Sequence, residues 1–349
     1  MKITMQALPN ELILHVIRCL IPSSPPVVFK PQHPVTKSLL NLTLVSHITS
    51  GAAKHLLLRH CLYLDSEERL AKLMSLRQQS SVDLNAAGPE GLFLAPFPAQ
   101  NLNCPSIVHN VSLLLSDISG TLARLVINLP LRFLYPEEDK NLLRPILREA
   151  FSHLTALEEF CSMQDELYLD TALERRGPQP EVWQAWPRLR YLALYNPCVD
   201  SARFVAGIKC CSNLTHLVLT RPDGIFNDVA DDQDGLGPLP RLEQVIIVNT
   251  ERGFSRDRRF HDDEGTAPDD TLLRGLKSGW LSNNQVGRAS AEMSESDYFC
   301  VAAEVPIPPD LVGEDDSDIL ACQGWVGSRA LSGTLWDESG APFLDWPES

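Results

Sequence analysis

Residues 186–194 read WPRLRYLAL, and the same phrase returns twice in altered form, as SNLTHLVL at 212–219 and LPRLEQVII at 239–247. Each copy places three aliphatic residues in the spacing L-x-x-L-x-L. The leading leucines of the three copies are 25 and then 28 positions apart. A motif that recurs at such a regular distance indicates that the chain builds one structural unit several times in succession.

This spacing has a physical reason. The last two aliphatic residues of each copy fall on one side of an extended strand, and the first closes the turn before it, so stacked copies line one continuous core. The separations lie within the roughly 20 to 29 residues of leucine-rich repeats, and LTALEEF at 154–160 resembles a fourth copy. The usual asparagine is misplaced, because Asn196 and Asn249 come one residue early, so we interpret the repeats as degenerate. Chance recurrence of leucine triplets in an α/β protein is the alternative.

The segments around these phrases alternate between strand and helix patterns. We predict helices at 66–78, 139–152, 200–211 and 271–277, and strands at 62–64, 107–115, 124–128, 298–305 and 319–325. Acidic stretches at 228–234, 262–264 and 314–318 read as solvated loops. We expect residues 331–349 to form a tail in which Trp336 and Trp346 pack back as a cap.

The N-terminal region has a different pattern. Residues 8–20 read LPNELILHVIRCL, in which Pro9 suits the first turn of a helix and Glu11 lies near its positive end. The apolar residues form a face too wide for a lone surface helix, so this helix must pack on two sides. A loop with five prolines follows at 21–37, and helical signals return from there to about residue 59. Three short helices with surplus apolar surface predict a binding partner.

The two N-terminal apolar phrases together resemble an F-box, which opens with Leu-Pro-x-Glu-Leu and closes with a leucine-rich phrase ending in Val-Ser. The matching residues are Leu8, Pro9, Glu11, Leu12, Val16, Ile17, Leu20, Leu40, Leu44, Val45 and Ser46. The phrase HCLYLD at 60–65 resembles the end of this module in fungal F-box-like proteins. The proline-rich segment is longer than in a compact F-box, and His47 stands where many members carry Lys or Arg.

This resemblance implies that the module binds the Skp adaptor of a Skp–cullin–F-box (SCF) ubiquitin ligase. Leu8, Pro9, Leu12 and Val45 are the first candidates for the contact face. The full set of candidate partner-binding residues is Leu8, Pro9, Leu12, Val16, Leu20, Leu40, Leu44 and Val45. In family members that also carry leucine-rich repeats, the curved stack of repeats holds the target protein.

Composition narrows the possible partners and compartments. The formal net charge of −15 argues against nucleic acid, and the one basic island, at 252–259, is interrupted and followed by acidic residues. The nine cysteines form no C-x-x-C pair, which is typical of a reducing compartment. There is no apolar run of about 18 residues and no leader-like N-terminus, so we expect no membrane partner and a cytoplasmic or nuclear location.

No catalytic motif is present in the sequence. There is no G-x-S-x-G elbow, no G-x-x-x-x-G-K phosphate loop and no H-E-x-x-H helix, and the nine histidines are dispersed. His55 and His60 are out of phase for a shared zinc ion, and no acidic run has the spacing of a calcium loop. We therefore predict no catalytic residues, no cofactor and no metal, and a protein that is not an enzyme.

The sequence thus predicts a fold of the α+β or α/β class with three parts. Residues 1–65 form a three-helix F-box-like module, 66–325 a degenerate leucine-rich-repeat solenoid with acidic loops, and 326–349 a C-terminal tail. The predicted function is an adaptor that binds Skp and, through it, a cullin, and that presents an unknown protein target. A Skp-binding or repeat scaffold without a ligase role is the alternative, followed by an enzyme of unrecognised type.

Overall fold

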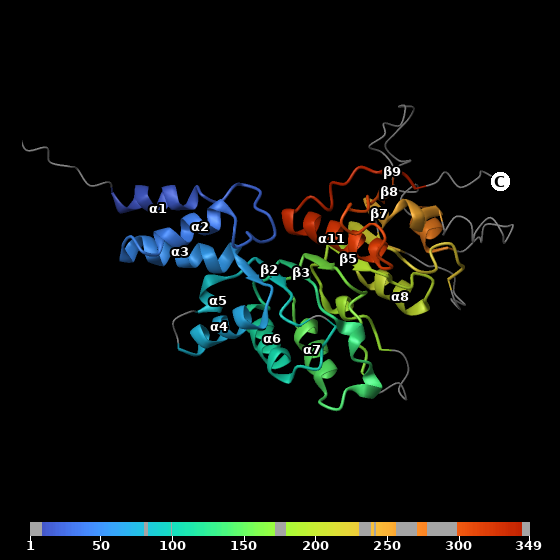
Figure 1. Cartoon of the computed structure of the whole chain (residues 1–349), viewed down its shortest axis with the longest axis horizontal. Coiled ribbons are helices and arrows are strands. Elements are labelled where there is room, and N and C mark those ends of the chain that lie inside the picture. The colour runs from blue at the N-terminus through green and yellow to red at the C-terminus, as the bar shows by residue number, and fades with distance from the viewer. Residues whose placement is uncertain are drawn as a thin grey trace, which may run out of the picture.

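The computed structural model describes residues 9–79, 83–98, 100–171, 179–229, 239–240, 242–255, 271–277 and 299–343. It begins with three helices, α1 (Asn10–Arg18), α2 (Pro34–Leu42) and α3 (His47–His60), which lie together at one end of the molecule (Figure 1). α3 packs against both α1 and α2, and Ile17, Leu39, Ala53 and Leu56 form a small core of their own.

A sheet of nine strands follows, and its strand order is the order of the sequence. All neighbours from β1 to β8 are parallel, whereas β9 is antiparallel to β8. The class is therefore α/β with an open parallel sheet. The strands are β1 (Leu62–Leu64), β2 (Gly91–Leu94), β3 (Arg124–Ile127), β4 (Glu159–Ser162), β5 (Tyr191–Tyr195), β6 (His216–Thr220), β7 (Gln244–Asn249), β8 (Cys300–Glu304) and β9 (Ala341–Pro342).

The three repeated phrases become successive strands in one register. β5, β6 and β7 each begin two residues after the leading leucine of their phrase, and they pair side by side. All nine aliphatic residues of the L-x-x-L-x-L spacing are buried in one core: the last two of each phrase share one face of the strand, and the leading leucine packs just before it. These nine residues are Leu189, Leu192, Leu194, Leu214, Leu217, Leu219, Leu242, Val245 and Ile247.

The entry to each strand repeats one hydrogen-bond pattern. A single carbonyl accepts from two consecutive backbone N–H groups at the start of the next strand, at distances of 2.7 to 3.2 Å. This happens at five successive steps, with the carbonyls of Glu90, Ala123, Glu158, Arg190 and Thr215 as acceptors. The junction fixes each strand against the previous one, so the unit that recurs in the structure extends beyond the three recognisable phrases.

Helices cover the two faces of the sheet unequally. The face that buries the repeat leucines is covered by α4 (Glu67–Gln78), α6 (Pro105–Ile118), α7 (Leu143–Ser152) and α8 (Ala202–Cys210), while α11 (Ser317–Ser332) lies on the opposite face (Figure 1). The connections also contain α5 (Leu84–Ala87) and the short 3-10 helices η1 (Leu131–Phe133), η2 (Pro136–Glu138) and η4 (Val182–Ala185). A helical turn at 272–277 matches the helix predicted there.

Two predicted strands and one boundary are wrong. Residues 107–115 lie in α6, and 319–325 lie in α11. The buried residues of α6 recur at helical spacing: they are Ile107, Val108, Val111, Leu114 and Leu115. A short apolar segment of this kind is easily mistaken for a buried strand. The predicted boundary between body and tail, at residue 325, falls inside α11.

The C-terminal part and the acidic stretches are described only in part. Trp336 packs back as predicted, since it is buried and its ring lies 5.3 Å from that of Tyr191. Trp346, the acidic residues 231–234 and 262–264, and the basic residues 256–259 lie outside the described residues. Within the described residues, no helix is both long enough and apolar enough to cross a membrane.

Candidate functional site

The first three helices expose large apolar side chains at positions that the sequence singled out. Pro9 is exposed, and the exposed fractions of Leu12, Val16, Leu40, Leu44, Val45 and Ile48 range from 45% to 87%. We call these seven residues the apolar surface of α1–α3. The N-terminus of α1 and the turn between α2 and α3 lie at the same end of this unit, remote from the sheet (Figure 1). Several large apolar side chains exposed on one small helical unit are typical of a protein-binding surface.

Two of the predicted contact residues are placed differently. Leu20 is half-buried and packs against the core of the three helices, so it supports the surface from beneath. Leu8 lies outside the described residues. Ile48 was missed by sequence reasoning, although its place directly after Leu44 and Val45 is a usable signal.

The local sequence explains why these side chains face solvent. Ile13 and Ile17 of α1, with Leu20 just after the helix, turn toward the small core, whereas Leu12 and Val16 remain exposed to solvent. Between α2 and α3, Ser46 and Thr49 form a capping box, with the Thr49 N–H donating to Ser46 Oγ at 3.3 Å and the Ser46 N–H to Thr49 Oγ1 at 3.0 Å. This cap ends the turn sharply and holds Leu44 and Val45 outside both helices.

The proline-rich segment attaches this unit to the sheet. Val27, Val28 and Phe29 are at most 2% exposed, and the two valines belong to the core beneath α11. The Val27 N–H donates to the Leu331 carbonyl at 3.1 Å, and the Phe29 N–H donates to the His60 carbonyl at 2.8 Å. The loop predicted from five prolines is therefore an anchored strap, a role that its three consecutive apolar residues could have indicated.

An ion pair supports the same junction. Arg59 at the end of α3 pairs with Glu90, the residue before β2, and His60 lies 3.7 Å from the same carboxylate. Burial alone would raise the pKa of Glu90, but the hydrogen bond and positive charge of Arg59 outweigh it and lower that pKa. The pKa of His60 is lowered because burial disfavours its charged form, although Glu90 opposes this.

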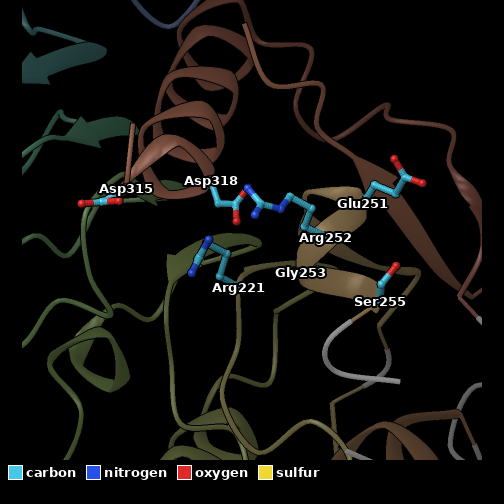
Figure 2. A pocket seen from close by; sticks show the side chains of 7 residues that line it. All are labelled: Arg221, Glu251, Arg252, Gly253, Ser255, Asp315 and Asp318. Atoms are coloured by element: carbon cyan, nitrogen blue, oxygen red, sulfur yellow. The ribbon is translucent and has the colours of Figure 1, made fainter. Parts of the chain in front are cut away.

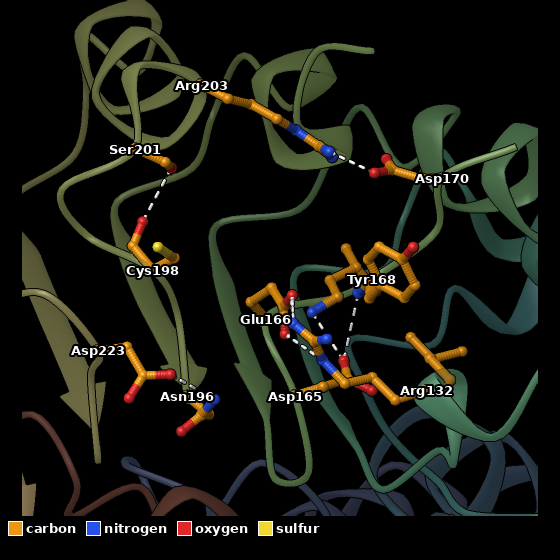
Figure 3. A network of polar contacts seen from close by, with 12 residues as sticks. Arg132, Asp165, Glu166, Tyr168, Asp170, Asn196, Cys198, Ser201, Arg203 and Asp223 are labelled. Carbon is orange, nitrogen blue, oxygen red and sulfur yellow. Dashed lines mark hydrogen bonds and ion pairs between the residues drawn. The ribbon is translucent and has the colours of Figure 1, made fainter. Parts of the chain in front are cut away.

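A second polar cluster joins the loops after β3 and β4 (Figure 3). Arg144 is fully buried, and its guanidinium donates to the carbonyls of Leu131 at 3.0 Å, Leu134 at 2.6 Å and Tyr168 at 2.9 Å, and also to that of Asp170. The guanidinium carbon Cζ of Arg144 lies 4.4 Å from the centre of the Tyr168 ring. The four carbonyl contacts order the backbone of these loops, so the arginine serves the fold.

The surroundings raise the pKa of two carboxyl groups in this cluster, those of Asp165 and Glu181. Burial raises the pKa of Asp165 to about 7, helped by the negative charge of Glu166, while backbone N–H groups of Leu167 and Tyr168 oppose the rise. Burial also raises the pKa of Glu181 to about 7, against the charge of Arg203. Arg132 pairs with Glu166, and Arg203 pairs with Asp170 and Glu181. These groups neutralise one another across loops.

The polar clusters were checked for a metal site, and the whole chain was compared with known proteins. In the part of the chain that the structure describes, no group of three or more His, Cys, Asp or Glu side chains could hold a metal ion. Comparison with known proteins found no matching family model, no matching curated protein and no matching solved structure.

Proposed function

We propose that the chain is an F-box-type receptor that binds the Skp subunit of an SCF ubiquitin ligase through the apolar surface of α1–α3. In this proposal the sheet body is a degenerate leucine-rich-repeat solenoid that presents a protein target. The chain supplies no bond-making step; it raises the effective concentration of target lysines at the ligase-bound conjugating enzyme.

The observation that carries this proposal is the exposure of Leu12, Val16, Leu40, Leu44 and Val45 on a unit that already has a core. Fold stability gives no reason to leave five large apolar side chains 51% to 87% exposed, because fully burying such a side chain contributes roughly 1.5–3 kcal/mol relative to full exposure. The same five residues occupy the apolar positions of the F-box resemblance. Binding to an adaptor gives them a common purpose.

The body supports the proposal through its repetition. Parallel strands in sequence order, with one hydrogen-bond junction recurring at five steps, are what a solenoid of short repeats requires. The strap from Val27 to Phe29 joins the helices to this body through buried contacts. A rigid join suits a receptor that must hold its target at a fixed distance from the ligase.

Co-purification of the tagged full-length chain from cells tests the proposal. The wild-type chain should retain Skp and a cullin, whereas Val45→Asp should weaken Skp retention at least tenfold, since a central apolar contact contributes about 2 kcal/mol or more. Val312→Asp is the matched control, because Val312 is 71% exposed and Val45 68%. It should retain Skp as the wild-type chain does, and both variants should keep the wild-type Tm.

Three outcomes separate the alternatives. Failure to recover Skp with the wild-type chain contradicts the proposal, as does equal loss in both variants. Recovery of Skp without a cullin favours a scaffold that lacks a ligase role. Mass spectrometry of the same samples identifies the other bound proteins. Those retained by both the wild-type chain and Val312→Asp, apart from Skp and the cullin, are the candidate targets.

A further inference from the structure

A pocket opens where β6 and β7 end and α11 begins (Figure 2). Its volume of about 580 Å³ is in the range of small-molecule sites. The pocket lies beyond the carboxyl ends of these two parallel strands. Its charged lining residues are Arg221, Glu251, Arg252, Asp315 and Asp318.

The charges in this pocket are unequally distributed. The guanidinium groups of Arg221 and Arg252 and the carboxylate of Asp318 gather at its centre, whereas Glu251 and Asp315 point away (Figure 2). Asp318 is held by the Thr250 hydroxyl, which donates to Oδ1 at 3.1 Å. Across the described residues, neither guanidinium has a hydrogen-bond or ion-pair partner. The centre therefore carries two positive charges against one negative charge.

The backbone at Arg221 adds a second observation. Arg221 follows β6 directly with a φ of 50°, in the left-handed region, and its N–H donates to the Val248 carbonyl at 2.8 Å. The corresponding corner after β5 has the same φ and is occupied by Asn196. Asparagine adopts this conformation more readily than arginine does. The corner thus does not itself require arginine at position 221.

A buried hydroxyl in the core beneath α11 is also unpartnered. Tyr195, paired with Thr220 across β5 and β6, is 5% exposed, and its hydroxyl finds no hydrogen-bond partner among the described residues. Burial raises the pKa of Tyr195; the positive charge of Arg221 opposes this rise, and the negative charge of Asp318 adds to it. Unpartnered buried hydroxyls are uncommon and call for an explanation.

We propose that this pocket binds a ligand through a carboxylate group placed between the guanidinium groups of Arg221 and Arg252. The N-terminus of α11, whose N-cap Asp316 makes no side-chain cap, is a further donor beside Asp318. A singly charged carboxylate completes the charge balance of the centre and fits the forked donors of arginine. A doubly charged phosphate would exceed that balance and leave excess negative charge beside the Asp318 carboxylate. This site is independent of Skp binding.

Calorimetric titration of the full-length chain tests the site with three probes: N-acetylglycine, its uncharged amide, and inorganic phosphate. Saturable binding is expected for N-acetylglycine alone. Arg221→Gln and Arg252→Gln should each weaken it roughly tenfold or more, the usual effect of losing a charge-assisted hydrogen bond. Arg188→Gln, at an exposed arginine outside the pocket, should bind as the wild-type chain does.

A second arm identifies the source of the carboxylate. An N-acetylated pentapeptide pool with free C-termini is compared with the same pool in amidated form. Tighter binding of the free-terminus pool than of N-acetylglycine indicates a protein C-terminus, and equal binding indicates a small molecule. The proposal is overturned if N-acetylglycine does not bind saturably, if its amide or phosphate binds equally well, or if Arg188→Gln weakens binding as much as Arg252→Gln.

Discussion

At the residue scale, Asp165 ties the stability of the fold to pH. Its carboxyl group is 2% exposed and follows β4 in the loop that Arg144 anchors. The Leu167 N–H donates to Asp165 Oδ1 at 2.7 Å. An asparagine oxygen could accept the same bond, so the position needs an acceptor and does not need a charge.

Asp165→Asn should therefore reduce the pH dependence of the free energy of unfolding. In the folded chain the pKa of Asp165 is about 7, and in the unfolded chain about 3.9, so between these values the folded state holds the extra proton. Stability from this group is full below about pH 4 and is lost as pH rises through 7.

Urea unfolding at pH 5 and pH 8 measures this effect. Wild type should lose roughly 1–4 kcal/mol between the two pH values through this group, and the variant should lose less. Some pH dependence of the unfolding free energy, with the same sign, should remain in the variant, because the pKa of Glu181 is also raised to about 7. If Asp165→Asn lost as much unfolding free energy between pH 5 and pH 8 as the wild type, Asp165 would not be the source of this pH dependence.

At the element scale, the strap from Val27 to Phe29 requires a glycine in β2. A Cβ atom on Gly91 would lie 1.8 Å from the Val27 carbonyl oxygen, so strap and strand could not keep their present contact. The strap is also held by Arg124, whose guanidinium donates to the Pro25 carbonyl at 3.0 Å. Side-chain size at one strand position thus controls how the first three helices are attached.

Gly91→Ala should displace the strap and lower the free energy of unfolding by about 1–3 kcal/mol, as overpacking does in a dense interior. Limited proteolysis should detect new cleavage between residues 21 and 33. The matched control is Gly120→Ala, where an added Cβ meets nothing within 4 Å. Equal protease resistance of the strap in both variants would show that the contact is not needed.

At the scale of the whole molecule, chain segments far apart in sequence complete one core. The face of the sheet opposite the repeat leucines is covered by α11 from near the C-terminus and by the strap from near the N-terminus. Val326 on α11 is 1% exposed in this core, whereas Leu320 on the same helix is 43% exposed. A solenoid with an open concave face would leave these strand residues in solvent.

Val326→Asp should detach α11 and expose the apolar residues beneath it. We expect a loss of about 3 kcal/mol or more in the free energy of unfolding, since an unpaired charge replaces a buried side chain, together with increased binding of an apolar fluorescent dye. Leu320→Asp introduces the same charge on the same helix and should change neither quantity. Dye binding that rises equally in both variants would contradict the packing role of α11.

The sequence by itself determined the repeated strands, because the spacing L-x-x-L-x-L places its aliphatic residues on one side of a strand in any stacked arrangement. It also determined that the N-terminal helices carry more apolar residues than their own core can bury. Those properties depend on local periodicity, which is readable along the chain.

Only the tertiary structure decided which apolar residues remain in solvent. Leu20 and Val45 are both apolar residues of the N-terminal phrases, yet Leu20 packs against the core and Val45 is 68% exposed. The burial of Val27 and Val28 and the convergence of Arg221 with Arg252 were likewise decided there. Each depends on contacts between segments distant in sequence, and periodicity within one segment does not encode its distant neighbours.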